Sequence, residues 1–161
     1  MAGRTANERP TRRIFLVEDH PGVRRGYELL LSLEPDLVVC GEAANARQAL
    51  ARILDSRPDL AIVDLALERS NGLDLIAHLH AQCPQVRVLV VSMHDEAGCI
   101  QTAQRAGASG YLTKDECPDE LIQAVRKVLQ GGHFLSARAR ARLGEPHDPG
   151  YPGPQRIQGS S

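Results

Sequence analysis

Five polar residues follow directly on runs of apolar residues, and together they have the types needed for phosphoryl chemistry. They are Glu18, Asp19, Asp64, Ser92 and Lys114. Ligands of an open parallel α/β sheet bind beyond the carboxyl ends of its strands. If each apolar run is such a strand, the five side chains gather at one edge of the sheet.

Three carboxylates in one pocket repel one another strongly. Glu18 and Asp19 are adjacent in the chain, and Asp64 joins them if the first and third strands are neighbours. A hard divalent cation removes this repulsion, and Mg²⁺ suits a site made of one or two carboxylates, waters and a phosphate. The backbone carbonyl of Ala66 is a further candidate ligand. We therefore expect a magnesium site here.

A hydroxyl and an ammonium group facing such an acid cluster suit a bound phosphoryl group. Ser92 would donate a hydrogen bond to it, and Lys114 would pair with one of its oxygens. Asp64 is then the natural nucleophile, forming an acyl phosphate. Taken singly, Asp19 is typical of a turn, Ser92 of a turn hydroxyl and Lys114 of the surface. The joint placement at predicted strand ends favours the functional interpretation.

The elements that must position these residues are five short apolar runs with helical patterns between them. The runs are 14–17, 37–40, 60–63, 86–91 and 111–112. Four are nearly continuous, which is typical of strands covered on both faces of a parallel sheet. Pro21 and Pro118 suit first helical turns, and Asn45 suits a helix cap. The pattern predicts an α/β fold, a (βα)5 doubly wound parallel sheet with right-handed crossovers.

Composition excludes several classes of protein. The chain has 161 residues, 42% of them hydrophobic and only 3% aromatic, with a formal net charge of -1. These values disfavour an aromatic platform for single-stranded nucleic acid and a global basic field for DNA or membrane. No apolar run approaches a membrane span. The four cysteines and six histidines lack zinc-finger spacing, so we expect reduced thiols in a cytoplasmic protein and surface or structural histidines.

The motifs resemble those of the receiver domain of two-component response regulators, in particular the NarL/FixJ (LuxR-type) regulators. The matching segments are IFLVEDHPGVRRGYELLL, VVCGEAANARQAL, RPDLAIVDLAL with NGLDLI, VLVVSMHDE, AGASGYLTKD and GGHFLS. They span roughly residues 13–136, the length of one compact domain. The resemblance implies a flavodoxin-like sheet with strand order 2-1-3-4-5.

The resemblance also implies a signalling phosphoacceptor that catalyses only its own phosphorylation and dephosphorylation. A sensor histidine kinase would phosphorylate Asp64 with Mg²⁺ held by Glu18, Asp19 and Asp64. Ser92 and Tyr111 would be the switch residues. The changed surface would control output, by analogy transcription through a helix-turn-helix domain, and a homodimer is possible.

Three positions depart from the family pattern. The loop LALERSNG keeps its usual length but lacks the Pro that many receivers carry after the phosphorylated Asp. Ala66 and His94 occupy positions that tune dephosphorylation in the family, so they should affect the lifetime of the phosphate.

The expected domain organisation is a disordered leader at 1–12, the receiver at 13–136 and a linker or disordered Pro/Gly-rich tail at 137–161. The stretch SARARARL within that tail is interpreted as a short helix or a basic linker, solvated rather than bound to nucleic acid. No helix-turn-helix is recognised in this chain, so contact with DNA would need a domain outside it.

Three other functions remain open from the sequence. A stand-alone receiver would act through protein–protein interaction. An Asp-nucleophile phosphatase of the haloacid dehalogenase type would need a second Asp two residues after Asp64, where Ala66 stands. A dinucleotide-binding protein would carry its Gly-rich loop after the first strand, whereas AGASGY precedes the last one.

Overall fold

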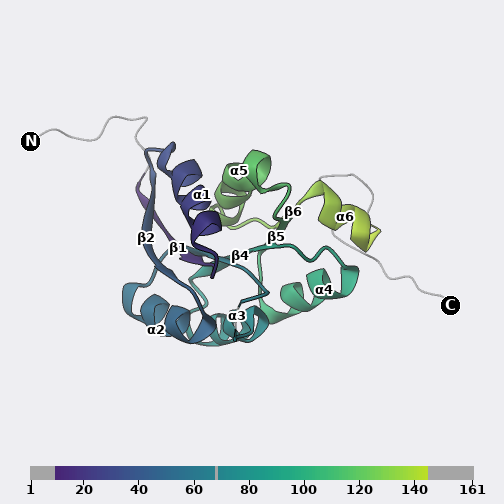
Figure 1. Cartoon of the computed structure of the whole chain (residues 1–161), viewed down its shortest axis with the longest axis horizontal. Helices are drawn as coiled ribbons and strands as arrows, with labels where there is room; N and C mark the ends of the chain where they lie inside the picture. Colours follow the sequence, from purple (N-terminus) through teal and green to yellow (C-terminus); the bar gives the residue numbers. More distant parts are fainter. Residues whose placement is uncertain (1–9, 68, 145–161) are drawn as a thin grey trace, which may run out of the picture.

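The computed structural model describes residues 10–67 and 69–144, which form one parallel sheet with helices on both faces (Figure 1). The strand order is β2-β1-β3-β4-β5-β6. The strands are β1 (Arg12–Val17), β2 (Leu37–Ala43), β3 (Leu60–Val63), β4 (Arg87–Ser92), β5 (Gly110–Thr113) and β6 (Phe134–Leu135). The helices are α1 (Pro21–Ser32), α2 (Ala46–Ser56), α3 (Gly72–Gln82), α4 (Ala97–Ala106), α5 (Cys117–Leu129) and α6 (Ala137–Leu143).

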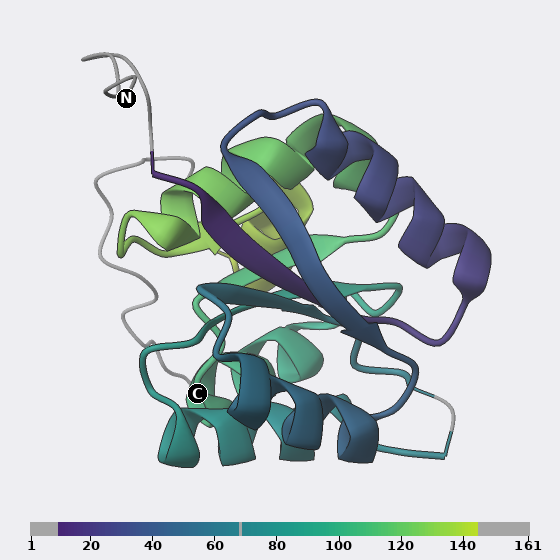
Figure 2. The ribbon, with the colours of Figure 1, turned by 90° about the vertical axis from the view of Figure 1, so that its left-hand side faces the viewer.

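Each central strand is buried on both faces. Along β1, Ile14 and Leu16 pack with α1 and α5, whereas Phe15 and Val17 pack with α2 and α3. Because the side chains of a strand point alternately to opposite faces, a continuous apolar run contributes to the hydrophobic cores on both faces of the sheet. Figure 2, seen from the β2 edge, shows the sheet between these two layers of helices. The predicted doubly wound α/β sheet with order 2-1-3-4-5 is confirmed, with β6 added beside β5.

Local signals in the sequence place the helix starts. Pro21 occupies the first turn of α1, where its missing N–H costs nothing. The side chain of Asn45 accepts a hydrogen bond from the Gln48 N–H at 2.9 Å and caps α2 as predicted. Asn71 caps α3 in the same way through the N–H of Leu73. These caps fix where the chain leaves the carboxyl edge of the sheet.

The end of the described chain is more ordered than the sequence pattern indicated. Residues 137–143, for which a helix and a basic linker were both open, form α6. Ser136 caps this helix through the Ala139 N–H, and Ala139 is fully buried. Of the predicted leader at 1–12, Arg12 belongs to β1, and residues 1–9 lie outside the described residues. Residues 145–161 of the predicted tail at 137–161 and Glu68 of the LALERSNG loop also lie outside them.

All four cysteines are free, and Cys83 and Cys117 are buried. Burial raises the pKa of the Cys117 thiol to about 12, so this thiol stays protonated at neutral pH. Among the residues that the structure describes, no helix combines the length and the apolar character that crossing a membrane requires.

Gly72 offers a test of how tightly α3 is packed beneath the sheet edge. A Cβ at Gly72 would lie 2.4 Å from the Asp64 carbonyl oxygen and 2.8 Å from the Leu65 Cα, both backbone atoms. We expect Gly72→Ala to lower the free energy of unfolding by about 2 kcal/mol, measured by urea denaturation. The control is Gly26→Ala in α1, where a Cβ meets nothing within 4 Å. That variant should be more stable than wild type by about 0.5–1 kcal/mol. Equal stabilities of the two variants would contradict this packing.

Candidate phosphoacceptor site

The Lys114 ammonium group lies between two buried carboxylates. Its Nζ is 2.9 Å from Asp64 Oδ2 and 2.9 Å from Glu18 Oε1. The Glu18 side chain is 0% exposed and that of Asp64 is 3% exposed. Residues from the ends of β1, β3 and β5 thus meet around one cation, as the sequence predicted for this edge.

The backbone continues its parallel pairing one residue past each strand and so fixes these positions. The Asp64 N–H donates to the Val17 carbonyl at 3.0 Å, and the Lys114 N–H donates to the Ser92 carbonyl at 2.9 Å. Because these ladders are rigid, the side chains leave the sheet from set points at the switch between β1 and β3.

Burial and ion pairing act on Lys114 in opposite directions. Burial alone would lower the pKa of Lys114, but hydrogen bonds and Coulomb attraction from Asp64 and Glu18 outweigh it and raise the pKa. The side chain therefore stays charged at neutral pH. Because the pKa is raised, the stability contributed by this charge is full below the unfolded pKa, near 10.4 for lysine, and is lost as pH rises through the folded pKa.

His20 contacts both members of the acid pair. Its Nδ1 lies 2.9 Å from Asp19 Oδ1 and 3.0 Å from Glu18 Oε2. A hydrogen bond with Glu18 and the nearby Asp19 charge raise the pKa of His20. The sequence predicts that His20 is a surface or structural residue. It is exposed, yet its place directly after the acid pair was a signal that it could touch them.

The charge balance at the cluster fits a divalent cation. Glu18, Asp19 and Asp64 bring three carboxylates, and Lys114 brings one ammonium group to the two buried ones. The oxygen donors are of the hard kind that Mg²⁺ prefers. Ala66 lies beside Asp64 and donates its N–H to Asp64 Oδ1 at 3.1 Å. Its carbonyl as a ligand stays a prediction.

Ser92 and Tyr111 are both fully buried and meet at the β4–α4 loop. The Ser92 hydroxyl oxygen accepts a hydrogen bond from the His94 N–H at 3.1 Å. The Tyr111 hydroxyl donates to the His94 carbonyl at 2.6 Å. The two predicted switch residues therefore hold the same loop residue from opposite sides.

Side chains next to Lys114, which the sequence did not single out, hydrogen-bond to one another and pair with α6. The Thr113 Oγ1 lies 2.6 Å from carboxylate oxygens of both Asp115 and Glu116. Arg138 of α6 pairs with Asp115, so α6 is tied to the residue next to Lys114. Arg142, also of α6, lies 3.0 Å from Asp95 in the β4–α4 loop.

A match to the family of response regulator receiver domains covers residues 14–126. The chain belongs to this family. The receiver is 40% identical over 131 residues to the DNA-binding transcriptional activator DevR/DosR of Mycobacterium tuberculosis, covering 81% of this chain and 60% of that protein. It is 35% identical over 131 residues to the nitrate/nitrite response regulator protein NarL of Escherichia coli K12, with the same coverage of both chains.

A solved LuxR-family two-component response regulator from Aurantimonas sp. SI85-9A1 has the same fold. Its TM-score is 0.80 at 36% identity, covering 83% of this chain and 96% of that one. The receiver is thus of the NarL/DevR type found in transcriptional response regulators. This chain spans about 60% of the length of the two curated relatives described above.

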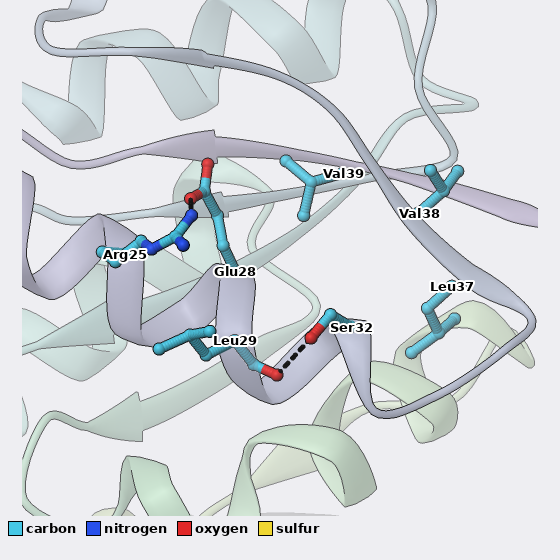
Figure 3. A pocket seen from close by; sticks show the side chains of 7 residues that line it. All are labelled: Arg25, Glu28, Leu29, Ser32, Leu37, Val38 and Val39. Atoms are coloured by element: carbon cyan, nitrogen blue, oxygen red, sulfur yellow. Dashed lines mark hydrogen bonds and ion pairs between the residues drawn. The ribbon is translucent and has the colours of Figure 1, made fainter.

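The receiver also carries a groove of about 450 Å³ between α1 and β2 (Figure 3). Its lining includes Arg25 and Glu28, which pair at 3.3 Å, and the apolar Leu37 and Val38. These residues lie in the middle of α1 and at the start of β2, whereas Glu18 and Asp19 precede α1 and the Glu18 N–H pairs with the last residue of β2, Ala43. The groove and the acid cluster are therefore separate features of the receiver.

The His20 imidazole reports on the acid pair in metal-free receiver. We expect NMR titration to give a His20 pKa above the usual value of about 6.5, and Asp19→Asn to lower it. Asp55→Asn, an exposed change on α2, should leave it unaltered. Because the pKa is raised, the stabilising contact is complete below pH 6.5 and is lost as pH rises through the folded pKa. A His20 pKa that Asp19→Asn leaves unchanged would contradict the contact.

Proposed function

We propose that this receiver accepts a phosphoryl group on Asp64 from a sensor histidine kinase and that the resulting change at its surface controls transcription. The observation that carries the proposal is the nearly buried Asp64 carboxylate, bonded to Lys114 and facing Glu18. A buried acid with a dedicated cation is suited to nucleophilic attack on phosphorus.

In the proposed reaction, an Asp64 carboxylate oxygen forms a bond to phosphorus while the bond from phosphorus to the kinase histidine breaks. The leaving imidazole nitrogen takes up a proton from solvent. Lys114 is released from Asp64 towards a phosphoryl oxygen and balances part of its charge, since the ammonium already lies 2.9 Å from Asp64 Oδ2.

Glu18, Asp19, Asp64 and the Ala66 carbonyl would hold Mg²⁺ in this proposal, in keeping with the excess of carboxylates over fixed cations. Bound Mg²⁺ would neutralise charge on the transferred phosphoryl group and orient it. His20 already contacts an oxygen of each member of the acid pair. A cation bound to this pair would therefore weaken the attraction between the pair and a protonated His20.

The switch would begin at Ser92. A Ser92 side chain that turns to donate its hydroxyl proton to the phosphoryl group would disturb the hydrogen bond that its oxygen accepts from the His94 N–H. The Tyr111 hydroxyl donates a hydrogen bond to the carbonyl of the same residue, His94. Movement of the loop would therefore change the hydrogen bonds of both Ser92 and Tyr111. Phosphorylation adds about 1.5–2 negative charges, enough to bias such a two-state element.

Helix α6 is the proposed route from the site to the output. Its Arg142 pairs with Asp95 in the β4–α4 loop, and its Arg138 pairs with Asp115 beside Lys114. Movement of either loop strains one of these ion pairs and alters how α6 docks. DNA would be bound by a helix-turn-helix domain that follows in full-length relatives, and not by the receiver itself.

The proposal extends to partners and location. The histidine kinase is the transient partner, a homodimer is a further possibility, and no membrane contact is invoked. Four free thiols, two of them buried, agree with the reducing conditions of the cytoplasm.

Labelling by a small phosphodonor tests the assignment of Asp64. With acetyl phosphate and Mg²⁺ we expect wild type to gain one hydroxylamine-labile phosphoryl group, detected by intact mass, and Asp64→Asn to gain none. Asp55→Asn, which changes an exposed acid on α2, is the matched control and should label like wild type. Equal labelling of Asp64→Asn and wild type would overturn the proposal.

A further inference from the structure

A second group of potential metal ligands lies in the β4–α4 loop, apart from the acid cluster. His94 Nδ1 is 3.4 Å from Glu96 Oε1, and Cys99 Sγ is 3.3 Å from the same oxygen. Ligand atoms of all three residues lie within 4.8 Å of one another. Glu96 directly precedes α4 and Cys99 is in its first turn, so the helix start fixes the backbone positions of two of the three residues.

The distances match the edges of a metal coordination tetrahedron. Zn²⁺ binds sulfur at about 2.3 Å and nitrogen or oxygen at about 2.0–2.1 Å, which puts tetrahedral ligand atoms about 3.3–3.6 Å apart. The two distances to the Glu96 oxygen are already of this size. A metal could therefore be bound with little movement of the backbone.

The kind of ligand separates this cluster from the magnesium site. Imidazole nitrogen, thiolate sulfur and one carboxylate oxygen form a set that favours borderline metals such as Zn²⁺ and Co²⁺ over Mg²⁺. The intervening acid, Asp95, is occupied by Arg142 at 3.0 Å. His94 and Glu96 are exposed, which leaves room for a water as the fourth ligand.

We propose that His94, Glu96 and Cys99 form a binding site for a borderline divalent transition-metal ion such as Zn²⁺. Binding replaces the thiol proton of Cys99, which passes to solvent, and the charge of the thiolate is then shared with the metal. Zinc-finger spacing does not reveal the site, because the ligands follow the pattern H-x-E-x-x-C across a loop and a helix start.

The site would act on the switch, an extension that rests on the proposed function. The backbone of His94 is bonded to the Ser92 hydroxyl and to the Tyr111 hydroxyl. A metal bound to the His94 side chain would hold the loop in this arrangement, in which Ser92 accepts from His94. It would therefore oppose phosphorylation-linked movement of Ser92, and phosphorylation would weaken metal binding by the same factor.

Cobalt is the most direct probe, because a thiolate ligand gives Co²⁺ a near-ultraviolet charge-transfer band that oxygen ligands do not give. The reduced full chain is titrated with Co²⁺ in excess Mg²⁺, which would occupy the acid cluster according to the proposed function. We expect the band to appear at one equivalent and to vanish on addition of Zn²⁺. Cys99→Ser should abolish it, whereas Cys40→Ser, at a half-buried thiol on β2, should retain it.

A second variant guards against a folding defect in the first. His94→Ala should keep the band but weaken Co²⁺ affinity by roughly tenfold or more, since even outer-sphere partners of metal ligands contribute about 10–100-fold. Absence of a thiolate band in wild type, or its persistence in Cys99→Ser, would overturn the site.

The coupling has its own test. Phosphorylated protein should bind Co²⁺ at least about fivefold more weakly than unmodified protein by the same band. An unchanged affinity would overturn the coupling while the site stands. Failure of Asp64 to be labelled at all would instead contradict the proposed function.

Discussion

The Lys114 ammonium group lies 2.9 Å from an oxygen of Glu18 and 2.9 Å from an oxygen of Asp64, and the carboxyl edge of the sheet depends on this shared contact. Both carboxylates are nearly inaccessible to water, so each would be costly to bury without a positive partner. Even with a protonated His20 beside Glu18 and Asp19, the three carboxylates outnumber the cations around them. The same contact therefore stabilises the resting fold and leaves a net negative site suited to a divalent cation.

The parallel sheet brings Glu18, Asp64 and Lys114 together although they lie far apart in the sequence. Backbone ladders continue to the Asp64 and Lys114 N–H groups, and α3 packs so closely that Gly72 leaves no room for a Cβ against the Asp64 carbonyl. The strands at the site are held by backbone hydrogen bonds, whereas α6 is joined to the β4–α4 loop by the side-chain ion pair of Arg142 and Asp95. Such ion pairs are worth less than core packing and can exchange. In the proposed switch, the sheet would therefore position the site residues, and the loop and α6 would move.

Much of this arrangement could be predicted from the sequence because continuous apolar runs and strand-end polar residues are local signals. The alternation of strands and helices and the Asn45 cap follow from them. The strand order, which brings Glu18, Asp64 and Lys114 together, was implied by the family resemblance. The two-residue strand β6 is too short to show a hydrophobic pattern in the sequence. The Arg-rich pattern of α6 resembles a solvated segment until its partners Asp95 and Asp115 are known.

The contacts of His20 and the cluster of His94, Glu96 and Cys99 escaped prediction for a related reason. Their meaning depends on how a loop turns at a strand end, and sequence spacing alone does not fix that turn. The roles of Asp64, Mg²⁺, Ser92 and Tyr111 in phosphoryl transfer remain predictions drawn from the residue types and the family.

A double-mutant cycle on Lys114 and Asp64 tests the shared ion pair most directly. Urea unfolding is measured in metal-free buffer for wild type, Lys114→Met, Asp64→Asn and the double variant. We expect Lys114→Met to cost about 3 kcal/mol in wild type, because two buried carboxylates lose their cation. In the Asp64→Asn background the cost should fall by at least about 1 kcal/mol. Costs equal to within about 0.5 kcal/mol in the two backgrounds would contradict the account.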